Sequence, residues 1–229
     1  MQASTGNPNP VRQSGGEPGS ISLRTFAPVL VAIGPAAIAI LRFVLPYDTT
    51  DSSRTMADKV IAHSAKESAV IWLSLVAILA MVPAVFWIGR YARQGAPRLG
   101  TVALALMVPG YLALGGLLSS DVLLWTGAKA GLSSASLAQM YDHLHPAVFV
   151  AEAVFVVGHV IGTVLLGLAL WRAPSVARWI AVAVVVCQPL HFIAAVVVSN
   201  HPLDLVAWGL NAVAFAAVAV TVRRTGSDR

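Results

Sequence analysis

The sequence predicts an all-α integral membrane protein, a bundle of about six transmembrane helices. Hydrophobic residues make up 57% of the 229 residues and charged residues only 11%, whereas a soluble domain carries about 25% charged residues. The mean hydropathy is +0.77. Several separate apolar runs reach the roughly 20 residues that a helix needs to cross a hydrocarbon core. These observations predict a multi-pass protein of the cell membrane.

The apolar runs follow a polar tail. Residues 1–23 are rich in Gly, Pro, Ser, Asn and Gln, a composition too polar to form a core, and they are predicted to be disordered. A transmembrane domain is predicted over 24–224 and a short tail over 225–229. The first apolar run is too long for the hydrophobic part of a signal peptide, so it is predicted to remain as a membrane helix. The predicted membrane helices are 26–47, 68–89, 99–120, 147–171, 179–199 and 203–222.

Charges in the connecting segments predict the orientation. Arginines gather in alternate connections, while most acids and histidines lie in the others. Because positive residues favour the cytoplasmic side, and because an even number of helices returns the chain to its starting side, both termini are predicted to be cytoplasmic. The arginines are Arg90, Arg93 and Arg98, then Arg172 and Arg178, then Arg223 and Arg224.

Two outer connections are long enough for short helices. The first, 48–67, is predicted to form a helix at the membrane surface. The connection between the third and fourth predicted membrane helices, 127–146, is predicted to contain a helix that begins at Ser133 or Ser134, because serine is a favoured N-cap residue. The single cysteine, Cys187, lies in an apolar run, which indicates a buried thiol and excludes an intramolecular disulfide.

Four acidic residues lie at the ends of the predicted membrane helices or inside them. Glu67 opens the second helix, Asp121 closes the third on the outer side, and Asp204 opens the sixth. Glu152 lies between one and two turns into the fourth. An ionisable group inside a membrane is costly and indicates a function by default, so these four are the candidate catalytic residues. Glu67 and Asp204 lie near the interface, where simple exposure to water is an equal alternative.

Further polar side chains lie near the predicted midplane: His159, Gln188, His191 and Asn211. Asn211 is seven residues after Asp204, and His159 is seven residues after Glu152, so each pair shares a helix face. These faces are expected to converge on one cavity that opens toward the outer leaflet. Asn, Gln and His also bond between helices as purely structural contacts, and for these residues that alternative stays open.

Aromatic residues in or near the outer half are candidates to line such a cavity: Trp72, Tyr111, Trp125 and Trp208. The aromatic belt at membrane interfaces accounts for part of this set. Arg42, near the outer end of the first helix, is expected to extend toward the interface or to pair with Asp121.

Several functions lack their motifs. The sequence contains no G-x-x-x-x-G-K-[ST], G-x-G-x-x-G or G-x-S-x-G, so nucleotide binding and the common hydrolase site have no support. It contains no H-E-x-x-H and no cysteine cluster. His143 and His145 have the spacing of a metal pair, but an isolated H-x-H is a weak signal. No metal or other cofactor is predicted, and the net charge of +5, which the loops explain, does not indicate nucleic-acid binding.

The segment VFVVGHVIGTVLLGLALWRAPSVARWIAVAVVVCQPLHF, followed by LDLVAWGL, looks like a family of small bacterial polytopic membrane proteins. Some members of that kind resemble the drimentine-type membrane-bound terpene cyclases, which cyclise a farnesylated indole or diketopiperazine into a drimane-like ring system. The resemblance covers about the second to the sixth helix. It implies catalytic carboxylic acids, one early in the chain and one near the last helix. By position these match Glu67 and Asp204, although no short motif marks them.

The resemblance implies a cofactor-free enzyme whose partner is a lipophilic prenylated small molecule from the lipid bilayer. Protonating an alkene needs a positioned acid shielded from water, and aromatic faces stabilise the cation that forms. Two other functions stay open. His159 and His191 are placed to be axial ligands of a b-type haem, and intramembrane acids also suit a small proton-coupled carrier or a structural membrane protein. Nothing in the sequence predicts the oligomeric state.

Overall fold

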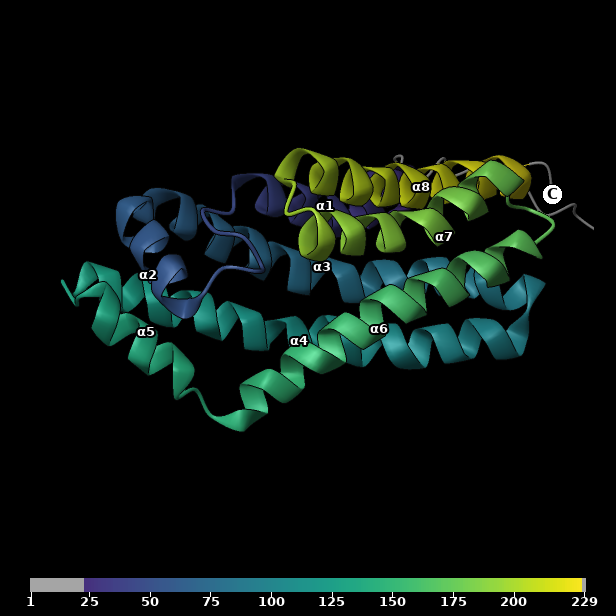
Figure 1. The fold of residues 1–229 in the computed structure, drawn as a ribbon. Helices are drawn as coiled ribbons and strands as arrows, with labels where there is room; N and C mark the ends of the chain where they lie inside the picture. The colour runs from purple at the N-terminus through teal and green to yellow at the C-terminus, as the bar shows by residue number, and fades with distance from the viewer. Residues whose placement is uncertain (1–22, 228–229) are drawn as a thin grey trace, which may run out of the picture.

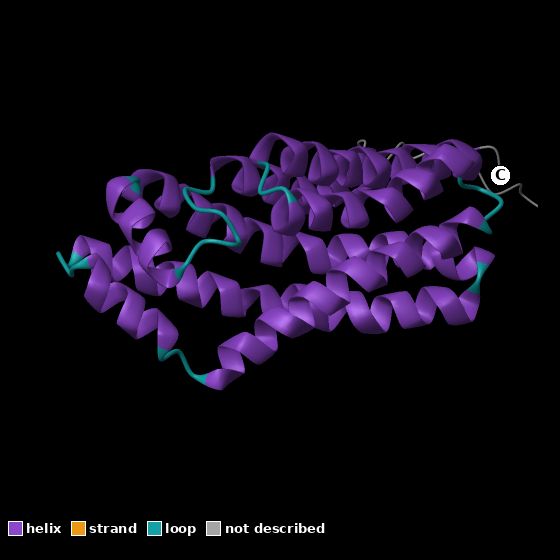
Figure 2. Cartoon of the chain, viewed as in Figure 1, coloured by secondary structure: helices purple, strands orange, loops and turns teal. Residues whose placement is uncertain are grey.

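The computed structural model describes residues 23–227, with side chains over 26–221, and this part of the chain consists of helices and loops without strands (Figure 2). The predicted N-terminal tail lies, apart from Leu23, outside the described residues. The helices are α1 (Leu23–Val44), α2 (Ser53–Ala62), α3 (Ser64–Gly95), α4 (Pro97–Lys129), α5 (Ser134–Asp142), α6 (Pro146–Trp171), α7 (Arg178–Phe192), the π-helical turn η1 (Ile193–Val197) and α8 (His201–Ser227).

Six helices in the described chain are long and apolar enough to cross a membrane, which confirms the predicted multi-pass architecture. They are α1, α3, α4, α6, α7 with η1, and α8. Figure 1 shows them running alongside one another, with the short helices α2 and α5 together at one end of the bundle, here called the α2/α5 end. The cytoplasmic location of the termini stays a prediction.

The six long helices form a closed ring. Each packs against the next long helix in the chain, and α8 packs back against α1. Within the ring, α3 also contacts α6 and α8. The interior of the ring therefore lies between α1, α7 and α8 on one side and α4 and α6 on the other.

Local sequence accounts for most helix boundaries. Ser52 caps α2 by accepting a hydrogen bond from the Thr55 amide, and Ser133 caps α5 by accepting one from Ser136, so both short helices predicted in the outer connections are confirmed. Pro97 begins α4 in the first turn, where its missing N–H costs nothing. α3 and α4 are longer than the apolar runs that predicted them, since each helix continues beyond both ends of its run. α8 runs on to Ser227, so part of the predicted C-terminal tail is helical.

Glycines set the crossing of α4 and α6. A Cβ atom on Gly158 would lie 2.7 Å from the Cα of Gly110 and 2.6 Å from the Leu106 carbonyl oxygen. A Cβ on Gly162 would lie 2.4 Å from Cγ of Met107. Small residues let membrane helices approach closely, so these glycines hold α6, and the polar residues on it, against α4.

Replacing Gly158 with alanine is expected to destabilise the bundle by about 1–3 kcal/mol, because the added methyl group meets backbone atoms that have no room to move. Denaturant unfolding in detergent micelles measures this change. Gly115→Ala on α4 is the matched control, since a Cβ there meets nothing within 4 Å. Equal stabilities of the two variants would contradict the close crossing.

α7 ends in an irregular turn. Pro189 lies inside α7, but the departure from regular α-helix begins at Ile193. There the backbone forms the π-helical turn η1, followed by a short loop and α8. π-turns are rare and frequently lie at functional sites.

Candidate functional site

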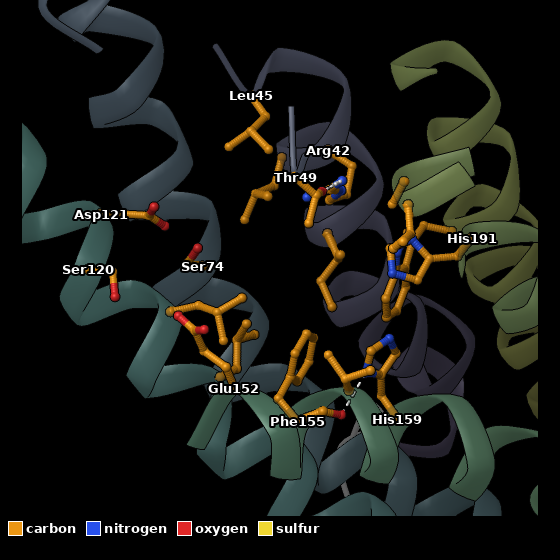
Figure 3. Close-up of a pocket in the computed structure, with 18 of the residues that line it drawn as sticks. Arg42, Leu45, Thr49, Ser74, Ser120, Asp121, Glu152, Phe155, His159 and His191 are labelled. Atoms are coloured by element: carbon orange, nitrogen blue, oxygen red, sulfur yellow. Dashed lines mark hydrogen bonds between the residues drawn. The ribbon is translucent and has the colours of Figure 1, made fainter. Parts of the chain in front are cut away.

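A cavity of about 280 Å³ lies inside the ring, near the α2/α5 end. Its walls come from α1, α4, α6, α7 with η1, and α8, together with the loop that follows α1 and one residue each from α2, α3 and α5. Most of the lining is apolar, but carboxyl, imidazole, guanidinium and hydroxyl groups also reach it. Figure 3 shows Asp121 and Ser120 on one wall and Arg42 and His191 on the facing wall. His159, His191 and the two acids Asp121 and Glu152 therefore meet in one cavity, whereas Gln188, Asn211 and Asp204 do not line it.

Asp121 and Glu67 form a pair of buried carboxyl groups on the first wall. Asp121 lines the cavity and is 6% exposed, while its neighbour Glu67 is fully buried. Neither oxygen of Glu67 has a hydrogen-bond partner among the described residues. Two adjacent buried carboxylates are costly when both are charged, so this pair is suited to hold a proton. The burial of Glu67 also argues against the alternative that it is exposed to water.

Two tyrosines from outside the membrane-spanning segments close this end of the cavity. The Tyr47 hydroxyl, in the loop after α1, donates a hydrogen bond of 2.5 Å to Oδ1 of Asp121. Burial and the Asp121 carboxylate raise the pKa of Tyr47 well above its ordinary value. Burial and the nearby Glu152 raise the pKa of Tyr141, on α5, to about 12. Both hydroxyls therefore remain protonated near neutral pH, and the proton of Tyr47 is donated to Asp121.

Glu152 reaches the cavity from α6 and is partly buried. Figure 3 places it on the same side as Asp121, together with Ser74 of α3. Three of the four acidic candidates, Glu67, Asp121 and Glu152, thus lie on this side of the site.

The fourth, Asp204, is held on the facing wall by two partners. Nε of Arg42 donates to its Oδ2 at 2.5 Å, and Nδ1 of His191 donates to its Oδ1 at 2.5 Å. A second guanidinium nitrogen of Arg42 donates to Thr49 at 3.0 Å. Asp204 is fully buried, so its charge is compensated by the guanidinium rather than by water. The group joins α1, α7 and α8.

This arrangement corrects two expectations. Arg42 forms its ion pair with Asp204 and not with Asp121, because α1 packs against α8 and turns Arg42 toward that helix. Asp204, which was weighed as a water-exposed residue near the interface, is enclosed by the ring.

An aromatic cluster contains both intramembrane histidines. The ring of His159 stacks on Phe155 at 4.2 Å and on Trp208 at 5.8 Å between centroids, and His191 lies 5.3 Å from Trp208. Nδ1 of His159 donates to the Phe155 carbonyl oxygen at 2.6 Å, since a carbonyl only accepts. Nδ1 of His191 is likewise committed to Asp204. In a neutral ring, Nε2 of each histidine therefore carries a free lone pair.

A second polar layer lies deeper in the bundle. On α6, α7 and α8 its residues stand three or four positions, about one helical turn, from His159, His191 and Trp208, and Tyr111 comes from α4. None of them lines the cavity. Their side chains are fully buried, and each has polar atoms without a hydrogen-bond partner in the described part of the chain. Buried polar atoms usually bond to protein or ordered water, so this layer is suited to hold water below the cavity. The residues are Tyr111, Thr163, Gln188 and Asn211.

Two predicted aromatic residues lie outside the site. Trp72 is 66% exposed and faces away from the bundle, so it belongs with the aromatic belt and not with the cavity. Nε1 of Trp125 donates to the Ser64 carbonyl oxygen at 3.1 Å, and its ring lies near Lys129. Trp125 therefore joins the helix ends at the α2/α5 end. Of the aromatic candidates, only Trp208 lines the cavity.

The remaining special residues have local roles. His143 bonds to the Gln139 carbonyl oxygen, and His145 caps α6 by accepting from the Ala147 amide, so the two do not act as a pair. The described residues contain no cluster of three or more metal-ligating side chains. Cys187 is buried, as predicted.

A polar cluster covers the cavity from outside. Nζ of Lys59 donates to Asp48 at 2.9 Å and to Asp51 at 2.7 Å, and Nε2 of His201 lies 3.2 Å from Asp48. These contacts join α2 and α8 to the loop that carries Tyr47 and Thr49, both of which line the cavity. The hydrogen bond from Lys59 lowers the pKa of Asp48, and the two aspartates raise the pKa of Lys59.

The mobility of this loop is expected to depend on pH. Because the folded pKa of Asp48 is depressed, its contribution is present above the ordinary carboxylate range and is lost below roughly pH 4. Because the folded pKa of Lys59 is raised, its contribution is lost only above roughly pH 10.5. A nitroxide label at position 54, in a Cys187→Ser background, should be immobile between these limits and mobile outside them. Lys59→Met should remove the dependence, and an unchanged profile in that variant would exclude the cluster as its cause.

Several residues that line the cavity were not predicted from the sequence. Tyr47 is the last residue of the first predicted helix, Tyr141 lies in a connection, and Ser74, Ser120 and Phe155 are types common in any membrane helix. A weak signal existed for Ser120, which directly precedes Asp121. For the tyrosines, only the folding of the connections over the bundle identifies them.

Comparisons with protein-family models, with curated proteins and with solved structures found no match to this chain. The described residues define a class of protein, an α-helical membrane protein with six helices long and apolar enough to span a bilayer and an internal cavity whose mostly apolar lining also carries polar groups.

Proposed function

We propose that this protein is a membrane-embedded terpene cyclase, which converts a prenylated small molecule into a cyclic isomer by acid-initiated cyclisation. The observation that carries the proposal is the composition of the cavity. The carboxyl group of Asp121 lies on one wall, with Glu67 near it. Imidazoles with free Nε2 atoms lie toward the other wall, and aromatic and aliphatic side chains line the cavity between them. The likeness to terpene cyclases noted in the sequence agrees with this chemistry.

Asp121 is the proposed proton donor. It lines the cavity, and the buried Glu67 near it makes a second negative charge costly, which favours keeping a proton on the pair. The proton from Asp121 adds to the terminal alkene of the prenyl chain, and the carbocation formed there is attacked by the next alkene. Each ring closure makes one carbon–carbon bond and moves the positive charge along the chain.

The later steps, charge stabilisation and final proton removal, use the aromatic cluster around His159, His191 and Trp208. The faces of Phe155 and Trp208 stabilise the moving charge, and Nε2 of His159 or His191 removes a proton from the final cation. One proton enters and one leaves, so the product has the mass of the substrate. Asp204 is assigned a positioning role, because it holds Nδ1 of His191 and is itself paired with Arg42. This differs from the role of acid that the resemblance implied for Asp204.

The proposed setting is a bacterial cell membrane with both termini in the cytoplasm, in the biosynthesis of a terpenoid natural product. The partner is a lipophilic prenylated molecule, such as a farnesylated indole or diketopiperazine. The apolar walls accommodate the prenyl chain, whose terminal alkene has to lie at Asp121, and the polar groups of the facing wall suit its head group.

A small proton-coupled carrier is the second candidate. The observation that favours it is the buried layer of Tyr111, Thr163, Gln188 and Asn211, which continues the polar interior below the cavity. Substrate-dependent proton uptake in sealed vesicles would support a carrier.

A haem protein is the third candidate, since Nε2 is free in both His159 and His191. Their ring centroids are 5.4 Å apart, so the helices would have to separate to admit a macrocycle between them. The visible absorption spectrum of the purified protein tests this directly.

The cyclase is tested by expressing the chain in bacterial membranes, adding farnesylated indole and related prenylated compounds, and searching for isomers of unchanged mass by mass spectrometry and NMR. A cyclic isomer is expected. Folded protein that yields no isomer from any of several prenylated substrates would overturn the proposal.

A further inference from the structure

The cavity wall between α6 and the end of α7 is a single side chain thick. Val156 on α6, Phe192 on α7 and Val196 on η1 all line the cavity. The same residues are 42%, 42% and 41% exposed. Elsewhere around the cavity, lining residues such as Ile38 and Trp208 are buried.

The thin wall results from the separation of two helices. α6 packs against α7, but among the described residues η1 contacts only α7 and α8 and has no contact with α6. Figure 1 shows α6 diverging from α7 toward the α2/α5 end. The gap therefore opens beside the cavity, where the π-helical turn replaces the regular end of α7.

The outer surface around this gap is apolar. Val157 and Ile193 flank it and are 49% and 45% exposed, and both lie in segments that are long and apolar enough to span a membrane. Side chains exposed there face lipid and not water. A route through the gap consequently connects the cavity with the hydrocarbon interior of the bilayer.

The aqueous side is covered by polar contacts. Tyr47 is bonded to Asp121, Arg42 is bonded to Thr49, and Lys59 holds the same loop through two aspartates. Opening that side would break several charge-assisted bonds, whereas opening the α6/η1 gap moves only valine and phenylalanine side chains.

We propose that the gap between α6 and η1 is a lateral portal through which one isoprenoid or acyl chain enters the cavity from the bilayer, with its polar end toward Arg42. The volume of 280 Å³ suits one chain and not the two chains of a phospholipid, since it lies at the small end of ligand pockets. The portal rests on the proposed function for the identity of the natural ligand, but it can be tested with a chain that cannot cyclise.

The test uses a palmitate probe that carries a diazirine on the chain, reconstituted with the full-length protein in phosphatidylcholine vesicles. After illumination, mass spectrometry should find the label on cavity residues such as Phe155. Val196→Trp should narrow the portal and lower that labelling by about tenfold, while Phe192→Ala should raise it. Val213→Trp is the matched control, because Val213 is 59% exposed on α8 and does not line the cavity. A diacyl phosphatidylcholine with the same diazirine should label only the outer surface.

Unchanged Phe155 labelling in both Val196→Trp and Phe192→Ala, or equal labelling of Phe155 by the diacyl probe, would overturn the portal. The two proposals fail separately. Labelling that follows the portal variants without any cyclic product would leave the portal and remove the cyclase. Cyclisation that is insensitive to Val196→Trp would leave the cyclase and remove the portal.

Discussion

Asp204→Asn is expected to lower the free energy of unfolding by about 3–5 kcal/mol, the typical cost of removing one partner from a buried ion pair. Asparagine keeps the shape of the side chain and can still bond to His191, but it leaves the charge of Arg42 without compensation inside the ring. Because this group joins α1, α7 and α8, the loss should loosen the closure of the bundle. Unfolding in a denaturing detergent, monitored by tryptophan fluorescence, measures the change.

Two further variants separate charge from packing. Arg42→Met combined with Asp204→Leu should recover much of the lost stability, since well-packed apolar residues often replace a buried ion pair without cost. Asp58→Asn is the control, because Asp58 pairs with Arg54 on the exposed surface of α2 at 3.7 Å and should change stability by less than about 0.5 kcal/mol. If Asp204→Asn proved as mild as Asp58→Asn, the buried ion pair would not be holding the ring together.

Asp121→Asn is expected to lower the turnover number of cyclisation by about 10²–10⁴-fold, the range that a positioned general acid supplies. The amide cannot deliver a proton to an alkene, although its oxygen can still accept the hydrogen bond from Tyr47. The Michaelis constant should change little, because the cavity keeps its shape. Steady-state kinetics with the prenylated substrate separate these two quantities.

Comparison with Tyr47→Phe tests the assignment of the donor. That variant removes the hydrogen bond to Asp121 but leaves the acid, so it should reduce turnover much less than Asp121→Asn does. Glu67→Gln should lie between them, since it removes one of the paired carboxyl groups without removing the donor. An Asp121→Asn enzyme with full turnover would exclude Asp121 and leave Glu152 as the acid on that wall.

The architecture was largely predictable from sequence. Six membrane helices follow from the length of the apolar runs, and the Ser133 cap of α5 follows from its serine and the polar segment around it. Spacing also indicated that His159 and Glu152 share a helix face, and both line the cavity. Such regularities are local, so a single helix suffices to show them.

The pairing of side chains was not predictable in the same way. Arg42 and Asp204 are 162 residues apart, and their contact depends on the packing of α1 against α8. Trp72 and Trp208 are both aromatic residues in membrane helices, yet one faces outward and the other is buried, because helix rotation within the ring decides which face turns inward. Apolar residues on every face of a membrane helix conceal that rotation in the sequence.

The most direct test of the proposed mechanism is cyclisation in heavy water. Buried carboxyl groups exchange their protons with solvent between turnovers. An acid-initiated cyclase should therefore place one deuterium on the less substituted carbon of the terminal alkene of the prenyl chain. We expect the native protein to form a cyclic product that contains one more deuterium than the product formed in normal water. This product should be absent with Asp121→Asn. A cyclic product without deuterium at that carbon would contradict proton transfer from the carboxyl pair.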